Sequence, residues 1–353
     1  MSPHDSEEKM PENETPETAE PETPETADDE TREKEAAEAA RYEVEETLES
    51  LDEAGDRSYS QGALVRRRFF RHRGAIVAMT GLAFVILLAF TSIGFGPIPG
   101  WWSKNFTDLY PSLEGGVPTL KLWPFTIGEH PFGQNTIGND YFALVMRGAQ
   151  KSIIIAFTVG LIATTIGTVV GAAAGYFRGW IETLLMRLTD LVIIIPLLVL
   201  AAVLGRMISG ANIYILAFVL GIVVWTGMAR LVRGEVLSLR EREFVHAAKA
   251  IGTSDWRIIF RHILPNAVGT IVVNSTLLIA SAILLETALS YLGFGVHPPE
   301  TSLGLLISQN ESAMTTRPWL FWWPGIFIVV IALCVNFIGD GLRDAFDPRQ
   351  QMD

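Results

Sequence analysis

Ionisable side chains within apolar runs are the first candidates for chemistry, because a charge is costly to bury in an apolar environment. Glu286 is the most isolated of them and lies in the run "AILLETALS". It could line a pathway and meet a cationic group of a passing solute. It could equally pair with Arg147 or with another helix, and the sequence leaves both readings open. Asp190 has Arg187 one helical turn away, so we expect a local ion pair there.

The chain lacks the residue combinations that are typical of enzymes. ATP hydrolysis of the Walker type needs a glycine-rich loop with a Gly-Lys pair, and this dipeptide does not occur in the sequence. His130 and Asp140 are weak evidence for a metal site, and no nucleophile stands beside a base. The single cysteine, Cys334, lies in an apolar run and is expected to serve helix packing. We therefore predict no catalytic residue, no metal site and no cofactor bound by this chain.

Charge divides the chain into two parts. Of its 353 residues 49% are hydrophobic, and the net charge is −12. Residues 1–60 contain 22 acidic and 5 basic side chains, so the remainder carries a net charge of +5. The Pro, Glu and Thr repeats of residues 1–30 have almost nothing to bury and predict disorder. We interpret residues 1–60 as an acidic, mostly disordered cytoplasmic tail.

The remainder is predicted to be an all-α, polytopic membrane protein, because an apolar run of about 20 residues can cross a bilayer as a helix. Six such spans are expected, at residues 75–95, 152–175, 184–205, 213–231, 267–291 and 323–340. Five arginines between residues 66 and 73 precede the first span, and this bias places both termini on the cytoplasmic side. The remaining parts are a basic anchor with the first span (61–95), an external loop expected to form an ordered ledge (96–151) and a core (152–349).

A charged helical module, residues 238–265, separates the fourth and fifth spans. Good helix formers predict a first helix from about Ser238 to Ile251, and Gly252 favours a left-handed helix stop. Pro265 is expected to end a second helix before the fifth span. Small residues in this module suit a surface on which another protein packs. An amphipathic loop that lies on lipid head groups is the alternative.

Two further patterns concern capping and packing. Thr253, Ser254 and Asp255 provide side chains that can cap the second helix of the module. In the second span, small residues recur at four-residue spacing, which lets another helix approach closely. These residues are Gly167, Gly171 and Gly175. Whether the approaching helix belongs to this chain or to a partner stays open.

The module resembles the EAA loop of ATP-binding-cassette (ABC) importer permeases. "HAAKAIG" followed by "HILP" places five residues at the spacing of that loop, namely Ala247, Ala248, Gly252, Leu264 and Pro265. His246 stands where the family usually has Glu. Four further stretches occur in the family's order: "HPFGQNTIGND", "GYFRGWIETLLMRLTDLVIIIP", "LSYLGFGVHPP" and "GDGLRDAFDPR". Over about residues 62–349 the chain is similar to the C-type subunit of dipeptide, oligopeptide and nickel importers.

This resemblance implies the six-helix fold of type I ABC importer permeases and a role as half of a translocation pathway. It implies that residues 238–265 couple to a cytoplasmic ATPase subunit through Ala247, Ala248, Gly252, Thr253, Ser254, Asp255, Leu264 and Pro265. The implied partners are a homologous B-type permease, two ATPase subunits that use ATP and Mg²⁺, an extracytoplasmic substrate-binding protein and membrane lipid, but no nucleic acid. Glu286 would then meet the amino terminus of a peptide.

Three other readings remain at this point. The same class of transporter could import nickel or another small solute. The chain could instead be a stand-alone secondary transporter, which is expected to place ion-coupling charges or broken helices near the middle of the membrane. A membrane scaffold that transports nothing is the third, and the motifs argue against it.

Overall fold

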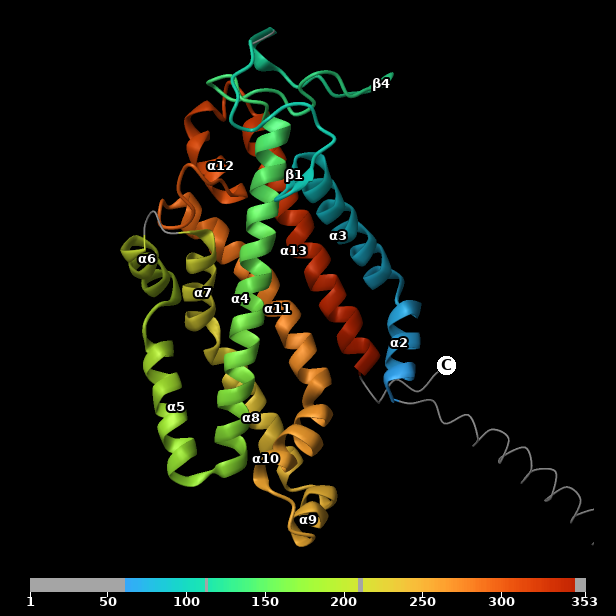
Figure 1. The fold of residues 1–353 in the computed structure, drawn as a ribbon, viewed down its shortest axis with the longest axis vertical. Helices are drawn as coiled ribbons and strands as arrows, with labels where there is room; N and C mark the ends of the chain where they lie inside the picture. Colours follow the sequence, from blue (N-terminus) through green and yellow to red (C-terminus); the bar gives the residue numbers. More distant parts are fainter. Residues whose placement is uncertain (1–60, 112–113, 209–211, 347–353) are drawn as a thin grey trace, which may run out of the picture. The chain divides into compact units, whose positions relative to one another are not determined.

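The computed structural model describes residues 61–111, 114–208 and 212–346. The predicted disordered tail, residues 1–60, lies outside this part, as do residues 347–349 of the predicted core. Within the described residues the chain is built almost entirely from helices, as Figure 1 shows, which confirms the predicted all-α class. Two small antiparallel hairpins add to them, β1 (Gly94–Phe95) with β2 (Ile98–Pro99) and β3 (Lys121–Leu122) with β4 (Phe125–Thr126).

The helices follow the order of the apolar runs in the sequence. Their bounds are α2 (Gln61–Arg71), α3 (Arg73–Ser92), α4 (Tyr141–Phe177), α5 (Gly179–Ile194), α6 (Leu197–Met207), α7 (Ile213–Val224), α8 (Thr226–Arg240), α9 (Glu243–Ala250), α10 (Asp255–Ile258), α11 (Leu264–Tyr291), α12 (Leu303–Gln309) and α13 (Trp319–Phe346). Short turns of other types are η1 (Glu114–Gly116), η2 (Ile259–Ile263) and η3 (Glu311–Ala313).

Membrane-spanning candidates fall into two kinds. In the described part of the chain, four helices are long and apolar enough to cross a bilayer: α3, α4, the continuous helix Asp255–Tyr291 and α13. Two further pairs meet this test only together, α5 with α6, bent by 84°, and α7 with α8, bent by 45°. Counting each bent pair as one span gives up to six spans.

Both bends have local causes. Between α5 and α6, Ile195 is extended, with a ψ of 125°, because the residue before a proline avoids the α region and Pro196 has no N–H to continue the helix. Between α7 and α8, Trp225 has a ψ of −18°, compared with about −42° in a regular α-helix, so the helix axis turns there.

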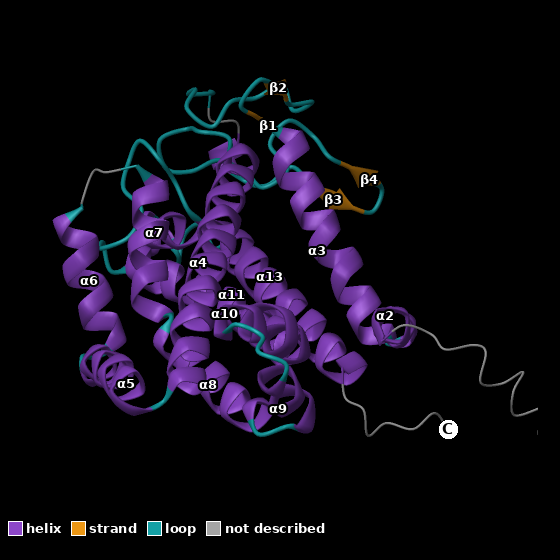
Figure 2. Cartoon of the chain, turned by 60° about the horizontal axis from the view of Figure 1, so that its bottom comes forward, coloured by secondary structure: helices purple, strands orange, loops and turns teal. Residues whose placement is uncertain are grey.

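The long helix α4 lies at the centre of the described body. It contacts α7, α8 and α11, and Figures 1 and 2 show α3 on one side of it and α5 with α6 on the other. It begins at Tyr141, so the loop expected over residues 96–151 ends eleven residues earlier, at Asp140. Arg147 and Lys151, which the prediction placed in this loop, are part of the helix and find partners on it or beside it.

The glycine stripe of α4 packs against α8 of the same chain. A Cβ atom built on Gly167 would come within 2.6 Å of the Cβ of Met228. One on Gly171 would lie 2.5 Å from the carbonyl oxygen of Ala229, and one on Gly175 would lie 2.8 Å from a backbone oxygen of α8. Because no side chain fits in these gaps, the three glycines let the two backbones approach closely.

Loops and short helices gather at opposite ends of this helical body. Residues 94–140, with both β-hairpins, lie at one end together with α12, whereas α9 and α10 lie at the other (Figure 1). The largest apolar core connects α3, α4, α7, α11 and α13, and a second, smaller core lies next to α9 and α10.

Candidate functional site

The charged module forms two short helices that meet at a glycine turn. The N–H of Gly252 donates to the carbonyl of Lys249 at 2.9 Å, and the N–H of Thr253 donates to that of Ala248 at 3.1 Å. Gly252 has a φ of +78°, a region that glycine adopts without steric cost, so the predicted left-handed stop is confirmed.

The helix expected from Ser238 to Ile251 is interrupted. α8 ends at Arg240, whose guanidinium donates to the backbone carbonyl of Tyr176 at 2.8 Å. Arg242 is then extended, with a ψ of 148°, and α9 begins at Glu243. Because the end of α8 is bound to α4 in this way, α9 leaves it in a new direction as a separate helix.

One side of the module is an exposed apolar surface. Ile251 is 83% exposed and Trp256 59%, and Phe244 and Phe260 are exposed beside them. We call these four residues the loop surface. Gly252 lies among them, and a Cβ built on it would meet no atom within 4 Å. Apolar side chains held this far into solvent are typical of a surface that binds another protein or the membrane.

The other side of the module is buried against α4 and α8. Val245, Ala248, Ile258, Ile259 and Ile263 pack there into the second core. The hydroxyl of Tyr176 donates to Asp255 Oδ1 at 2.6 Å, which ties α10 to the end of α4. The loop surface is therefore attached to a part of the module that packs against α4 and α8. The adjacent alanines differ, since Ala247 is exposed and Ala248 is buried.

Two expectations about the second helix of the module were wrong. Ser254 occupies the N-cap of α10, but its side chain forms no capping hydrogen bond, and the Asp255 carboxylate accepts from Tyr176. Pro265 does not end the helix. It follows a π turn, in which the N–H of Leu264 donates to Ile259, and it lies in the first turn of α11, where a missing N–H is tolerated.

His246, which replaces the Glu usual in the EAA loop, points away from the base of the module. Its side chain is 62% exposed, and its Nε2 lies 4.0 Å from Glu241 Oε2. This distance between exposed groups contributes little to stability. The imidazole is therefore accessible to a binding partner.

Glu286 is completely buried, at 0% exposure, and its partners are serines. The Ser152 hydroxyl of α4 donates to Glu286 Oε2 at 2.8 Å, and the Ser290 hydroxyl donates to Glu286 Oε1 at 2.7 Å. Each hydroxyl also accepts a backbone N–H, Ser152 from Leu303 and Ser290 from Val296. The carboxylate thus holds the segment between α11 and α12 against α4 and α11.

The basic residues near this cluster bind another acid. Lys151 Nζ lies 2.9 Å from Glu300 Oε1, and an Arg147 guanidinium nitrogen lies 3.7 Å from Glu300 Oε2. Glu286 therefore does not pair with Arg147, but it does contact another helix, the other form of that reading, through Ser152 of α4. Its other reading, as a residue of the pathway, stays a prediction.

Asp190 and Arg187, expected to pair locally, do not do so in the structure. Asp190 Oδ1 instead lies 2.5 Å from the guanidinium of Arg230 on α8. About two helical turns earlier on α5, Glu182 binds Arg233 of α8, with an Arg233 Nε to Oε1 distance of 2.8 Å. These two contacts connect α5 to the first half of α8.

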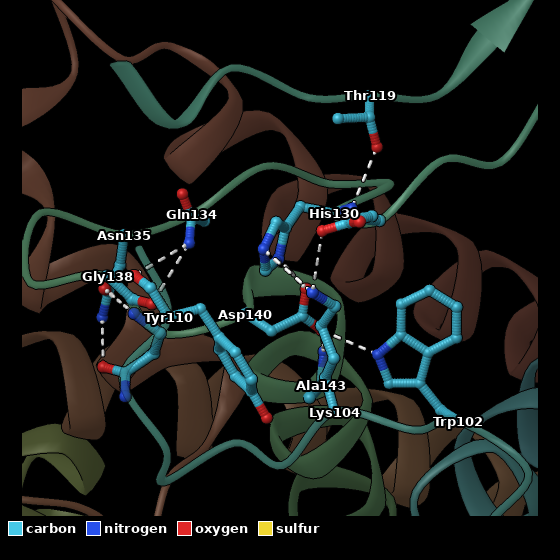
Figure 3. A network of polar contacts seen from close by, with 12 residues as sticks. Trp102, Lys104, Tyr110, Thr119, His130, Gln134, Asn135, Gly138, Asp140 and Ala143 are labelled. Carbon is cyan, nitrogen blue, oxygen red and sulfur yellow. Dashed lines mark hydrogen bonds and ion pairs between the residues drawn. The ribbon is translucent and has the colours of Figure 1, made fainter. Parts of the chain in front are cut away.

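At the opposite end of the body, Asp140 organises the loops before α4, as Figure 3 shows. Its carboxylate lies 2.7 Å from His130 Nδ1, accepts the indole N–H of Trp102 at 2.8 Å, and caps α4 through the N–H of Ala143 at 3.0 Å. Lys104 Nζ lies 3.3 Å from His130 Nε2 on the other side of the ring. This network connects residues 102, 104, 130 and 140 and forms the centre of the ledge, residues 102–111 and 114–140. No group of three or more potential metal ligands occurs among the described residues.

An apolar cavity of about 330 Å³ lies where both bent pairs meet α11. Pro196 and Leu197 line it from the first bend, Thr226 from the second, and Ser281 and Leu285 from α11. No ionisable side chain lines it. The bends therefore open a space that is apolar apart from two hydroxyls.

Several of these contacts could not be found from the sequence by the arguments above. Ser152 is 134 residues from Glu286 in the sequence, although the four-residue spacing of Glu286 and Ser290 on one helix is a usable signal. Nothing in the sequence indicated that Tyr176 binds Asp255, because a lone tyrosine at the end of a span is typical of an interfacial anchor.

Comparison with known proteins agrees with this arrangement. The model of the family described as binding-protein-dependent transport system inner membrane component matches residues 167–352. The model of the N-terminal transmembrane domain of oligopeptide transport permease C matches residues 60–108.

Two relatives show how far the similarity extends. The oligopeptide transport system permease protein OppC of Mycobacterium tuberculosis is 39% identical over 293 residues, which are 83% of this chain and 96% of the relative. The protein of the same name from Haemophilus influenzae is 33% identical over 308 residues, 87% of this chain and 95% of the relative. Together with the family match and the helices long enough to cross a bilayer, these similarities show that the chain is a multi-pass membrane protein and belongs to the family of inner-membrane components of binding-protein-dependent transport systems.

Proposed function

We propose that this chain is a permease subunit of an ATP-driven ABC importer and forms half of a pathway that carries peptides across the cell membrane. The peptide assignment is supported by the relatives, which are named as oligopeptide transport permeases. Nickel or another small solute is the alternative within the same class. The observation that carries the proposal is the loop surface, an exposed apolar patch on a buried and hydrogen-bonded base.

Coupling to an ATPase is assigned to the module 238–265. A coupling surface must be accessible to its partner and firmly connected to the spans that move. Ile251, Gly252 and Trp256 meet the first requirement, since they are exposed. Asp255 meets the second through Tyr176 of α4. Thr253, Leu264 and Pro265 shape the turn and the entry into α11, and Ala247 and Ala248 form the exposed and buried sides of α9.

The proposal defines partners and orientation. ATP and Mg²⁺ are used by two separate cytoplasmic ATPase subunits, a homologous B-type permease completes the pathway, and an extracytoplasmic binding protein delivers the substrate. The arginines of α2 support a cytoplasmic position for this end and for both termini, by the positive-inside rule. The ledge organised by Asp140 then faces the binding protein.

The pathway is assigned to the side of the body where the two bent pairs meet α11. The cavity there is lined by apolar side chains and two hydroxyls, which suits peptides of varied sequence better than a selective charged site. Glu286 lies outside the lining of this cavity and is held by serines. Its contact with a peptide amino terminus would require that these hydrogen bonds open during transport.

The test is to tag the full chain, extract it gently from its native membrane and identify the subunits that come with it. We expect a second permease and one or two ATPase subunits. Ile251→Glu places a charge in the loop surface and should release the ATPase subunits. Ile137→Glu, at an isoleucine that is 69% exposed at the opposite end, is the matched control and should retain them. Uptake of labelled peptide, compared with uptake of nickel, then decides the substrate class.

A stand-alone secondary transporter is the second candidate, and the two broken spans are the observation that favours it. The cavity at these breaks has no ionisable lining residue, however, whereas ion-coupled sites usually contain them. Recovery of the chain alone, even after cross-linking, with uptake that persists without ATP, would favour this candidate and reject the coupling proposal.

A further inference from the structure

A groove of about 1030 Å³ lies at the end of the body that contains α2, between that helix, α11 and α13. Its apolar lining comes from all three helices and includes Leu64, Phe69, Val268, Leu342 and Phe346. Its polar side chains are Arg66, Arg68, Glu235, Asn266 and Thr270. We call this space the inner groove. It combines a long apolar wall with guanidinium groups on one helix.

The ends of two spans indicate at which level of the membrane the inner groove lies. α3 begins at Arg73, two residues after α2 ends, and α13 ends at Phe346, which lines the groove. A groove at the point where spans begin and end lies at the level of the lipid head groups. On the orientation proposed above, on which this inference rests, it opens in the cytoplasmic leaflet.

Two charged side chains of the inner groove, Arg66 and Glu235, are available to a ligand. Arg66 is exposed and Glu235 is half-buried, and neither forms an ion pair with another residue of the described chain. The Asn266 amide is occupied locally, since it donates to the carbonyl of His262 at 2.6 Å. The groove thus offers a guanidinium and a carboxylate next to a long apolar wall, which is the chemistry of an amphiphile with an anionic group and hydroxyls.

We propose that the inner groove binds one anionic glycerophospholipid of the cytoplasmic leaflet, of the phosphatidylglycerol type. Basic pockets between membrane helices on the cytoplasmic side bind anionic head groups, and guanidinium groups are well suited to phosphate oxygens. Arg66 contacts the phosphodiester, and one acyl chain lies along Val268 and Phe346. The glycerol hydroxyls of the head group donate to the carboxylate of Glu235, which would repel a second phosphate.

The experiment measures lipid retention by the full chain in its native complex. The complex is transferred into nanodiscs made of equal parts phosphatidylcholine, phosphatidylethanolamine and phosphatidylglycerol, then extracted in mild detergent, and the retained lipids are quantified by mass spectrometry. We expect enrichment of phosphatidylglycerol. Since a basic residue near the membrane surface contributes about 1 kcal/mol, Arg66→Gln should weaken this retention about fivefold.

Matched variants separate the groove from general charge and from hydrophobic surface. Arg71→Gln removes the same charge from α2 outside the groove and should retain phosphatidylglycerol. Val268→Trp fills the groove and should abolish the enrichment, whereas Leu277→Trp, at a similarly exposed position of α11, should leave it unchanged. Equal effects of Arg66→Gln and Arg71→Gln would overturn the proposal, as would a preference for phosphatidylethanolamine.

A photo-reactive amino acid at position 268 distinguishes lipid from protein in the groove. A phosphatidylglycerol adduct supports the proposal, and an adduct with any polypeptide overturns it. Neither result depends on transport. Loss of ATPase subunits from the purified complex would count against the proposed function alone, because the photo-adduct forms at position 268 of this chain.

Discussion

Ser152 Oγ lies 2.8 Å from Glu286 Oε2, and this hydrogen bond connects α4 with α11 in the interior of the protein. The Ser290 hydroxyl completes the arrangement on the other carboxylate oxygen at 2.7 Å. Because both hydroxyls also accept backbone N–H groups from residues 296 and 303, a single carboxylate fixes the position of the segment before α12. Glu286 thus acts on the fold through its neighbours.

Replacing Glu286 is predicted to destabilise the protein. Glu286→Ala leaves two buried hydroxyls without an acceptor, and each such loss costs about 1–3 kcal/mol. We expect a clear decrease in the thermal unfolding midpoint of the detergent-solubilised chain. Glu286→Gln should be milder, since its amide still accepts one hydrogen bond. Glu129→Gln, at a carboxylate whose side chain is 71% exposed, is the control. A midpoint unchanged by Glu286→Ala would contradict the role assigned to the cluster.

At Gly252, a substitution that adds charge is predicted to reduce ATP-driven uptake more than one that only adds size. At a φ of +78° any other residue is strained by about 1–2 kcal/mol, and this cost is common to Gly252→Ala and Gly252→Glu. A Cβ there meets no atom of the described residues within 4 Å, so we expect a partner to distinguish the two variants. We expect Gly252→Ala to retain most ATP-driven uptake and Gly252→Glu to lose it while remaining in the membrane. Normal uptake by Gly252→Glu would be the contradicting result.

The contact between α4 and α8 is predicted to tolerate no added methyl group at Gly171. Its Cβ would lie 2.5 Å from the carbonyl oxygen of Ala229, and overpacking of this kind costs about 1–3 kcal/mol. Gly227→Ala adds the same group on α8 with no atom within 4 Å, and the better helix propensity of alanine should make it neutral or stabilising. Unfolding in increasing denaturant compares the two variants, and equal stability would reject the close approach.

Removal of the Asp140 carboxylate is predicted to loosen the ledge. Asp140→Ala deletes the N-cap of α4, a change worth about 0.5–2 kcal/mol, and leaves the Trp102 indole without its acceptor. We expect faster protease cleavage and faster amide hydrogen exchange between residues 102 and 139. Asp108→Ala, at an exposed aspartate of the same loop region, should change neither rate.

The sequence was most informative where a single residue controls the local backbone. Gly252 predicted its left-handed turn because few other residues adopt that conformation. The apolar runs predicted the spans because length and hydropathy alone decide whether a helix can cross a bilayer. Pro265 was misread for a related reason, since a proline breaks a helix interior but is tolerated in a first turn, and the sequence does not show where that turn begins.

The contacts of the candidate site depend on tertiary structure, so they were harder to predict from the sequence. Asp190 had Arg187 beside it in the sequence, yet α8 brings Arg230 closer. The start of α4 was placed eleven residues late, and Lys151, inside the helix, is paired by Glu300, which is 149 residues away. In both cases the deciding partner is far along the chain, so neither periodicity nor local spacing could identify it.

The helix α4 has a mechanical consequence. It runs without interruption from the Asp140 cap to Tyr176, which holds Asp255, and its 37 residues correspond to a rod of about 55 Å. A regular helix is stiff along its axis. On the function proposed above, a displacement of α10 would therefore reach the ledge along α4 as the movement of a stiff rod.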